Sequence, residues 1–245
     1  LFYLILFFLG SVLMRSAGCI VNDILDKKFD RKVERTKNRP IASGKISNFR
    51  GILYAAILCF LAFLVLINFN DFTIVLALAS MPLAFTYPLM KRFTYWPQLF
   101  LGITFNYGLI LGWTSINPEI NALPIIFYFG AIFWTLGYDT IYGYQDIKDD
   151  EIIGVKSTSI KFKKNPIKFL LMAYLIFFIS VTYITYNLNF NPIFYLFLLI
   201  IFYQLFFNQI FNFNKDKPKL CLKIFKSNNI LGLLIYLNIL IGKMI

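Results

Sequence analysis

Three oxygen-bearing side chains, Asn22, Asp26 and Asp30, recur at intervals of four where a long apolar stretch turns polar. Residues four and eight apart fall on one face of an α-helix, so these side chains would form a single row. Arg15 lies near the same stripe. A row of amide and carboxylate oxygens is typical of a site for a hard divalent cation such as Mg²⁺.

A second acidic row follows far downstream at Asp139, Asp146 and Asp150. Spacings of seven and eleven also share a helical face, so we expect one helix across residues 139–150, with Tyr142 to one side. The chain contains no histidine, so a hard-metal site here must use oxygen ligands. Two such rows across a cavity would hold about two or three magnesium ions that bridge a diphosphate.

The composition indicates that these rows belong to an integral membrane protein. Of the 245 residues, 59% are hydrophobic and only 15% are charged, against roughly 45–50% and 25% in soluble domains. Runs such as 193–207 are apolar almost all round and do not alternate, which favours helices over barrel strands. We therefore expect an all-α, polytopic membrane helical bundle that forms a single domain over residues 1–245.

Eight spans are predicted, each near the ~20 residues that cross a bilayer. They cover residues 1–21, 51–68, 72–90, 97–115, 123–145, 169–187, 192–211 and 228–244. The short connections 68–71, 115–121 and 187–191 contain no Lys or Arg. The other loops are strongly basic, so the positive-inside rule places them in the cytoplasm. A bacterial inner membrane is expected, and the net charge of +12 needs no nucleic-acid partner to explain it.

The start of the chain, Leu1, already lies inside an apolar run. If the basic loops are cytoplasmic, span 1–21 puts Leu1 outside, and one further span upstream is expected. The chain would then contain two four-span units and a final span. In each unit the acids close the second span, and a basic loop with a glycine follows, at Gly44 and Gly154.

Acids at a helix end are often only solvated, and Lys27 or Lys28 would then pair with Asp23 or Asp26. Two clusters on the same side of the membrane favour a functional site instead, since carboxylates beside membrane spans are candidates for function.

The motifs around both clusters resemble those of the UbiA-type intramembrane prenyltransferases, over essentially the whole chain. Residues 22–30 resemble N-D-x-x-D-x-x-x-D, and 35–44 look like R-T-x-N-R-P-L-x-S-G. Residues 139–150 are similar to the second aspartate motif, and 154–158 to G-x-K-S-T. The segment Y-P-L-M-K-R at 87–92, with 97–98 and 101–102, looks like the 4-hydroxybenzoate polyprenyltransferase branch.

The resemblance implies a helical bundle, usually of nine spans, with a central cavity open to lipid; the first span would be missing here. It implies Mg²⁺ as the cofactor and a polyprenyl diphosphate and an aromatic acid, 4-hydroxybenzoate, as substrates in ubiquinone biosynthesis. The implied metal ligands are Asn22, Asp26, Asp30, Asp139, Asp146 and Asp150, with Asp26 and Asp146 central to catalysis.

Other side chains would handle the organic groups. Arg92, or Lys91 in its place, is expected to bind the carboxylate of the acceptor. Lys156 and Arg39 would compensate diphosphate charge, and Tyr142 would stabilise an allylic cation through its ring face.

Two alternatives remain at this point. A sister prenyltransferase would use another acceptor, such as dihydroxynaphthoate or haem. A membrane transporter would also combine apolar spans with charges, but those charges typically lie near the bilayer midplane.

Overall fold

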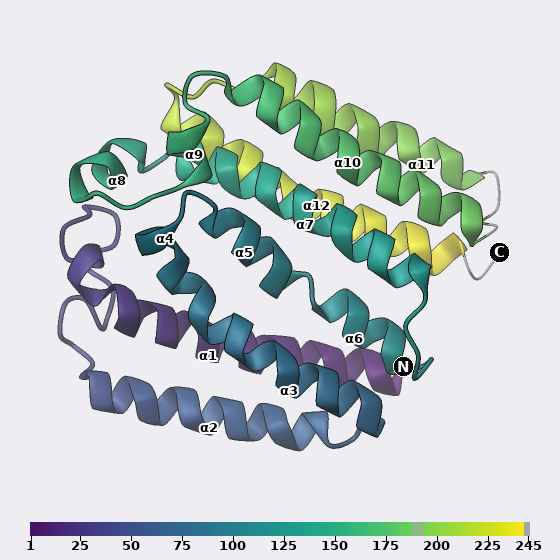
Figure 1. Cartoon of the computed structure of the whole chain (residues 1–245), viewed down its shortest axis with the longest axis horizontal. Coiled ribbons are helices and arrows are strands. Elements are labelled where there is room, and N and C mark those ends of the chain that lie inside the picture. The colour runs from purple at the N-terminus through teal and green to yellow at the C-terminus, as the bar shows by residue number, and fades with distance from the viewer. Residues whose placement is uncertain (189, 191–192, 243–245) are drawn as a thin grey trace. The chain divides into compact units, whose positions relative to one another are not determined.

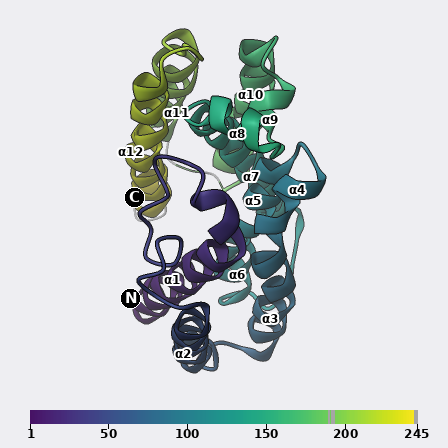
Figure 2. The same cartoon turned by 90° about the vertical axis from the view of Figure 1, so that its left-hand side faces the viewer.

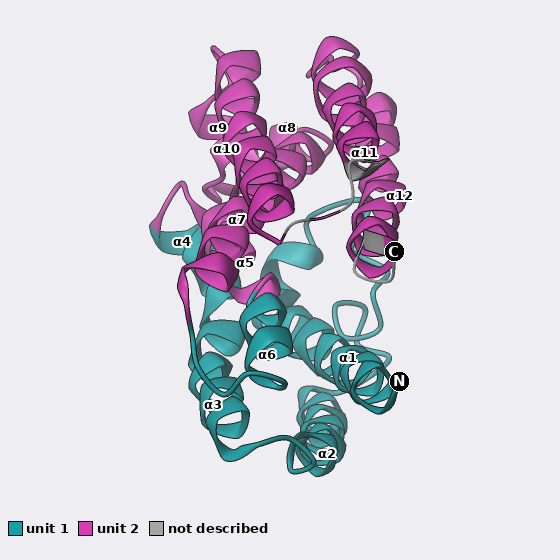
Figure 3. Ribbon diagram, turned by 90° about the vertical axis from the view of Figure 1, so that its right-hand side faces the viewer, with its two compact units in different colours: residues 1–93, 107–120 teal, residues 94–106, 121–245 magenta. Residues whose placement is uncertain are grey.

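The structure is a computed structural model that describes residues 1–188, 190 and 193–242. Every regular element in these ranges is a helix, which confirms the all-α expectation. Six of the described helices are long and apolar enough to cross a membrane, so a multi-pass membrane protein is also confirmed. The described residues form two compact units, unit 1 (1–93 and 107–120) and unit 2 (94–106 and 121–245), shown in Figure 3.

Unit 1 is organised around α1 (Phe2–Asp30), which packs along α2 (Asn48–Leu66), as Figure 2 shows. Ser47 caps α2 by accepting a hydrogen bond from the Arg50 N–H. Asn70 caps α3 (Asp71–Thr86) through the Thr73 N–H, at 2.9 Å. Both residues belong to the types that prefer helix N-caps, because their side-chain oxygens satisfy exposed backbone donors.

The chain continues from α3 through a 3₁₀ turn, η1 (Tyr87–Leu89), into α4 (Met90–Phe93). η1 contacts α1, so this turn brings the start of α4 back toward the polar end of α1. Pro88 is buried in that turn, where its missing N–H is tolerated. Lys91 and Arg92 are therefore delivered beside the first acidic row.

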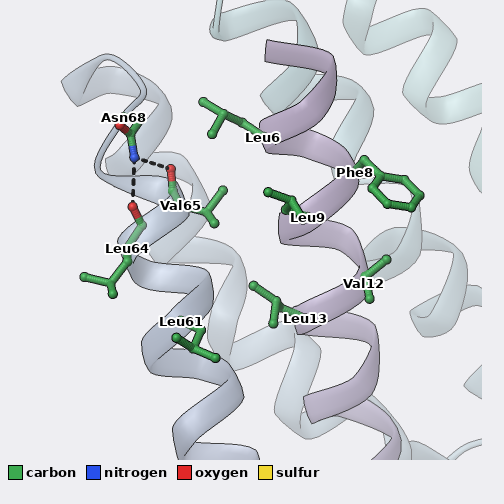
Figure 4. Close-up of a pocket in the computed structure, with 9 residues that line it drawn as sticks. All are labelled: Leu6, Phe8, Leu9, Val12, Leu13, Leu61, Leu64, Val65 and Asn68. Carbon is green, nitrogen blue, oxygen red and sulfur yellow. Dashed lines mark hydrogen bonds between the residues drawn. The ribbon is translucent and has the colours of Figure 1, made fainter. Parts of the chain in front are cut away.

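An open apolar groove of about 420 Å³ runs between α1 and α2 near their other ends (Figure 4). Asn68 closes one end, donating to the Leu64 and Val65 carbonyls. Outward-facing side chains such as Leu4, Ile52 and Phe60 are exposed. Such a surface is stable against hydrocarbon, which agrees with placement in a bilayer. The groove lining consists of Leu6, Phe8, Leu9, Val12, Leu13, Leu61, Leu64, Val65 and Asn68.

Unit 2 is built around α7 (Ala122–Gly143), which packs against α10 (Pro166–Asn187), α12 (Pro218–Gly242) and α5 (Pro97–Phe105), as Figure 1 shows. The α7–α10 contact is close because glycines meet larger side chains there. A Cβ at Gly137 would collide with the Tyr174 ring, and one at Gly130 with Ser180. Small residues that let backbones approach are typical of helix pairs in membranes.

The eight predicted spans are not confirmed as eight. Span 97–115 is wrong as one helix, because it divides into α5 and α6 (Gly108–Thr114), each too short to cross a bilayer. The break follows Asn106, whose side-chain amide donates to the Gly102 and Ala131 carbonyls and to Thr135 Oγ1.

The last two predicted spans are only partly described. Residue 192, where one of them starts, and residues 243–244, where the other ends, lie outside the described residues. Within the described ranges, α11 (Ile193–Phe202) runs into a π-helical segment, η2 (Tyr203–Phe211). α12 starts ten residues earlier than its predicted span, since Pro218 opens it in place of residue 228. Proline is favoured in the first turn of a helix.

Candidate active site

The first acidic row lies on a single helix, as the sequence predicted, and that helix belongs to unit 1. Asn22, Asp26 and Asp30 occupy the last turns of the continuous helix α1. Asn22 is half-buried, whereas the side chain of Asp26 is only 3% exposed and that of Asp30 10%. Buried carboxylates need partners, because desolvation strongly disfavours an isolated charge.

Lys91 is the partner of Asp26. Its Nζ forms an ion pair with Asp26 Oδ2, and Arg92 Nη2 lies 3.9 Å from Asp26 Oδ1. Arg92 also donates to the Leu25 carbonyl at 2.7 Å and lies 5.2 Å from the centre of the Phe29 ring. Asp26 Oδ1 is buried and accepts no hydrogen bond. The sequence assigned both cations to the acceptor; the structure places them at a metal-ligand candidate.

Arg39 joins two other acids of this cluster. Its Nη1 donates to Asp23 Oδ1 at 2.9 Å and to Asp30 Oδ2 at 3.1 Å. The basic loop folds back to make this possible: Thr36 Oγ1 donates to the Asp30 carbonyl, and Gly44 turns the chain at φ 86°. Only glycine adopts such a φ without strain.

The second acidic row is arranged differently from the prediction. The single helix expected across 139–150 is wrong, because α7 ends at Gly143. Asp146 is the N-cap residue of a new helix, α8 (Ile147–Ile153), and Asp150 lies in its first turn. Asp139 remains on α7, so the three carboxylates do not share one helical face.

Local chemistry explains the break. Gly143 approaches Ser159 so closely that a Cβ would collide with its hydroxyl, and Gln145 Nε2 donates to the Tyr142 carbonyl at 3.1 Å. The first turn of α8 forms when the Asp150 N–H donates to the Asp146 carbonyl at 2.9 Å. Aspartates are stable at helix N-termini, where they face the positive end of the helix dipole.

α8 ends at Gly154, whose φ of 81° places it in the left-handed region, and Lys156 follows. The Lys156 Nζ lies 5.6 Å from the centre of the Tyr95 ring. Ser157 caps the short helix α9 (Thr158–Lys161). Each acidic cluster is thus followed by a basic loop with a glycine, as the sequence predicted, and both glycines are left-handed.

The segment after Lys156 is fixed by residues that the sequence reasoning did not assign. Gln98 Oε1 accepts from the Thr158 N–H at 3.0 Å, Thr140 Oγ1 lies 2.6 Å from Thr158 Oγ1, and Ser159 Oγ donates to the Thr140 carbonyl. All four side chains are buried. The signal in the sequence was a set of polar residues within apolar stretches.

Tyr142, the proposed cation-stabilising residue, is half-buried on α7. Its ring centre lies 4.4 Å from that of Phe225 on α12.

Taken separately, each cluster offers oxygen ligands that suit Mg²⁺. Within the described residues no three Asp, Glu or Cys side chains are gathered closely enough to enclose a metal ion. The open lone pairs of Asp26 Oδ1 fit a hard cation, because a buried carboxylate oxygen without a donor is otherwise costly. The first cluster belongs to unit 1 and the second to unit 2, and their meeting around one cavity stays a prediction.

The family of the chain follows from a match to a protein-family model. The model described as the UbiA prenyltransferase family matches residues 1–233. The chain belongs to this family. The match extends over both acidic clusters and both basic loops, so the resemblance seen in the motifs is confirmed.

Curated members of the family resemble the chain along nearly its whole length. The mitochondrial 4-hydroxybenzoate polyprenyltransferase of Bos taurus is 42% identical over 246 residues, which cover 99% of this chain and 66% of that protein. The Homo sapiens protein of the same name is 40% identical, with the same coverage. The chain thus spans just under two thirds of the length of these relatives.

Solved structures of family members share the fold. A UbiA homolog from Aeropyrum pernix K1, in its apo form, has a TM-score of 0.77 at 22% identity and covers 98% of this chain and 89% of its own. A UbiA homolog from Archaeoglobus fulgidus, bound to GPP and Mg²⁺, has a TM-score of 0.71 at 18% identity and covers 100% and 87%.

Proposed function

We propose that this protein transfers a polyprenyl group from polyprenyl diphosphate to a ring carbon of 4-hydroxybenzoate, with Mg²⁺ as cofactor. The relatives that are 40–42% identical over nearly the whole chain are named for this activity. An archaeal homologue of the same fold is described as bound to a prenyl diphosphate and Mg²⁺. The proposal places the chain in ubiquinone biosynthesis.

The observation that carries the proposal is the state of Asp26. A membrane helix ends in a carboxylate that is 3% exposed, paired with Lys91 on one oxygen and without a donor on the other. A carboxylate kept buried between cations is suited to a site where a divalent cation and an anion bind together. A solvated helix end would instead leave the acid exposed.

In the proposed site, side-chain oxygens of the acidic residues would hold Mg²⁺. Bound there, the metal would neutralise charge that develops on the departing diphosphate. The proposed ligands are Asn22, Asp26, Asp30, Asp139, Asp146 and Asp150.

The basic residues of the chain bind the diphosphate and orient it. Lys91, which pairs with Asp26 in this structure, would supply positive charge to the diphosphate when Mg²⁺ is bound. Arg39 already neutralises Asp23 and Asp30, so it shields the incoming anion from them. Lys156, beside Tyr95, supplies charge from the second basic loop.

The reaction needs an acceptor held against the allylic carbon. Arg92 binds the acceptor carboxylate through its planar guanidinium, which matches two oxygens at once. The C–O bond to diphosphate breaks, the ring carbon ortho to the phenol attacks the allylic cation, and that carbon then loses its proton. The Tyr142 ring faces the cation and stabilises it.

The relatives are named as mitochondrial proteins. They therefore do not support the bacterial inner membrane that the sequence analysis expected. We propose that the basic loops face the matrix or cytoplasmic side, as the positive-inside rule predicts.

Membranes that contain the protein test the proposal directly. They are incubated with a polyprenyl diphosphate, Mg²⁺ and a panel of labelled acceptors: 4-hydroxybenzoate, dihydroxynaphthoate and haem. We expect label in a prenylated 4-hydroxybenzoate, only when Mg²⁺ is present. Prenylation of another acceptor would reassign the substrate. Uptake of label into vesicles without a new C–C bond would indicate a transporter instead.

A further inference from the structure

Unit 2 contains a buried amide pair that the proposed reaction does not use. Gln209 on η2 and Asn228 on α12 bond to each other twice, from Gln209 Nε2 to Asn228 Oδ1 at 2.9 Å and from Asn228 Nδ2 to Gln209 Oε1 at 3.3 Å. Each oxygen accepts one further donor. Tyr174 Oη on α10 donates to Gln209 at 2.6 Å, and Trp134 Nε1 on α7 donates to Asn228 at 2.8 Å.

This amide pair joins four helical elements inside the bilayer region. Gln209 and Tyr174 are 0% exposed and Asn228 7%. Asn and Gln side chains commonly hydrogen-bond between neighbouring membrane helices. A clamp between η2 and α12 alone would need only the Gln209–Asn228 bonds. The hydrogen bond from Trp134 to Asn228 is not needed for such a clamp, so it indicates a further role for the pair.

The π-helical form of η2 lets two of its glutamines, Gln204 and Gln209, face α12. In an α-helix, residues five apart point about 140° away from each other. The wider i→i+5 turn brings Gln204 and Gln209 to the same side, and both meet α12: Gln204 donates to Ser227 Oγ at 2.8 Å, beside the Gln209–Asn228 bonds. π-helical turns are uncommon and occur frequently at functional sites.

Trp134 is held on three sides. Its indole N–H is bound by Asn228, and its ring stacks on Phe177 with 5.0 Å between centres and 9° between planes. Gly232 leaves room for its edge, since a Cβ there would lie 3.4 Å from the ring. The remaining neighbour is Tyr138, edge-on at 5.6 Å. The amide pair therefore adds a directional hydrogen bond to an indole that is also held by packing.

Trp134 is the deep end of an aromatic row. Trp134, Tyr138 and Tyr142 recur every four residues on one face of α7, and all three are half-buried. Phe225 on α12 contacts Tyr138 at 5.7 Å and Tyr142 at 4.4 Å, so the row is continuous. It ends just before Asp146. Trp134 lies about 12 Å deeper along α7 than Tyr142, from the rise of 1.5 Å per residue.

We propose that Gln209 and Asn228 are positioning residues that orient Trp134 against the distal part of a bound prenyl chain. The inference rests on the proposed function. The diphosphate end lies by the aspartates and the allylic carbons by Tyr142, so only a long chain reaches Trp134. The amide pair thereby affects which chain lengths are used, and not the chemistry at the allylic carbon.

Four forms of the protein test this: wild type, Trp134→Phe, Asn228→Leu and Ser227→Ala. Trp134→Phe keeps a ring on Phe177 but removes the N–H donor. Ser227→Ala is the matched control, because it breaks the adjacent bond between η2 and α12 without touching Trp134. For each form, kcat/KM is measured with solanesyl diphosphate and with geranyl diphosphate, at saturating 4-hydroxybenzoate.

In Trp134→Phe and Asn228→Leu, the ratio of kcat/KM for the long over the short substrate is expected to fall about tenfold, as for loss of one apolar contact in a specificity pocket. Ser227→Ala keeps the wild-type ratio. The indole hydrogen-bond band in the ultraviolet resonance Raman spectrum shifts in Asn228→Leu and not in Ser227→Ala. An equal loss for both substrates in Asn228→Leu, or an unchanged ratio in Trp134→Phe, overturns the proposal.

Binding separates this inference from the proposed function. The affinities for the two diphosphates are also measured by titration calorimetry in detergent with Mg²⁺ and no acceptor. A wild type that transfers no prenyl group to any acceptor refutes the proposed function. The positioning role then stands or falls on whether Asn228→Leu weakens solanesyl diphosphate more than geranyl diphosphate.

Discussion

Lys91 is the ion-pair partner of Asp26, although the two residues lie 65 positions apart in the chain. The pair joins the start of α4 to the last turns of α1. Lys91 is the counter-ion of Asp26, the most buried acid in the first cluster.

Replacing Lys91 with methionine leaves the Asp26 carboxylate buried without its main cation. Loss of one partner of a buried pair costs about 3–5 kcal/mol, and because Lys91 is 27% exposed we expect the free energy of unfolding to fall by less. Thermal unfolding in detergent measures the change. The double variant Asp26→Asn, Lys91→Met should lose less than the sum of the single variants. Simple additivity would contradict the pairing.

Asp26→Asn and Asp146→Asn should each reduce Mg²⁺-dependent prenyl transfer by about 10²-fold or more, because charge on the departing diphosphate is no longer balanced. Membrane insertion should be unchanged. Transfer is measured in membranes with labelled 4-hydroxybenzoate. Glu119→Gln, an exposed acid outside both clusters, serves as the control. Wild-type turnover in either aspartate variant would refute the metal assignment.

Arg39→Gln should weaken diphosphate binding, because Asp23 and Asp30 then repel the anion without their shared guanidinium. The matched control is Lys37→Gln in the same loop. Among the described residues Lys37 pairs with the exposed Glu34, and such surface pairs contribute about 0–1 kcal/mol. Titration calorimetry with a prenyl diphosphate and Mg²⁺ compares the two variants. Equal affinities would show that Arg39 acts only in folding of the loop.

Arg92→Ala should raise the apparent KM for 4-hydroxybenzoate about tenfold or more, since a bidentate charge-assisted contact is lost. The KM for the prenyl diphosphate should change little. Arg50→Ala, an exposed arginine at the start of α2, controls for loss of positive charge in general. A rise in the KM for diphosphate alone would move Arg92 from the acceptor to the leaving group.

Gly154→Ala should destabilise the end of α8, because an alanine at φ 81° costs about 1–2 kcal/mol. Gly154→Asn should be milder, as asparagine tolerates this conformation better. Gly112→Ala, where a Cβ meets open space, is the control. Unfolding temperatures and the affinity for prenyl diphosphate report the effect, since Lys156 follows two residues later. Equal stability of the three variants would contradict a strained turn.

The sequence predicted the first acidic row correctly because α1 continues as a helix through Asp30, so its periodicity holds. It failed for the second row, since the same arithmetic assumed a helix that in fact ends at Gly143. Periodicity cannot show that α7 ends at Gly143, where the chain passes close to Ser159. Gly143 and Ser159 are also too far apart in the chain for a helical repeat to reveal their contact.

The sequence could not predict contacts between residues that lie far apart in the chain, for a related reason. The sequence predicts a role for Lys91 in binding the acceptor, but the residues next to it in the chain do not reveal its pairing with Asp26. Gln98 and Thr158 are 60 positions apart, and their hydrogen bond appears only in the folded chain. Residue types and charge placement could be interpreted without a structure, whereas pairings across the chain could not.

The Lys91–Asp26 pair also bears on how the protein is assembled during synthesis. Asp26 is synthesised 65 residues before Lys91. A carboxylate at the centre of a membrane helix costs about 2.5–3.5 kcal/mol on translocon scales. Asp26 is therefore expected to wait at the lipid–water boundary until α4 brings its cation. A later segment of the chain thus supplies the charge that lets the end of the first helix bury its carboxylate.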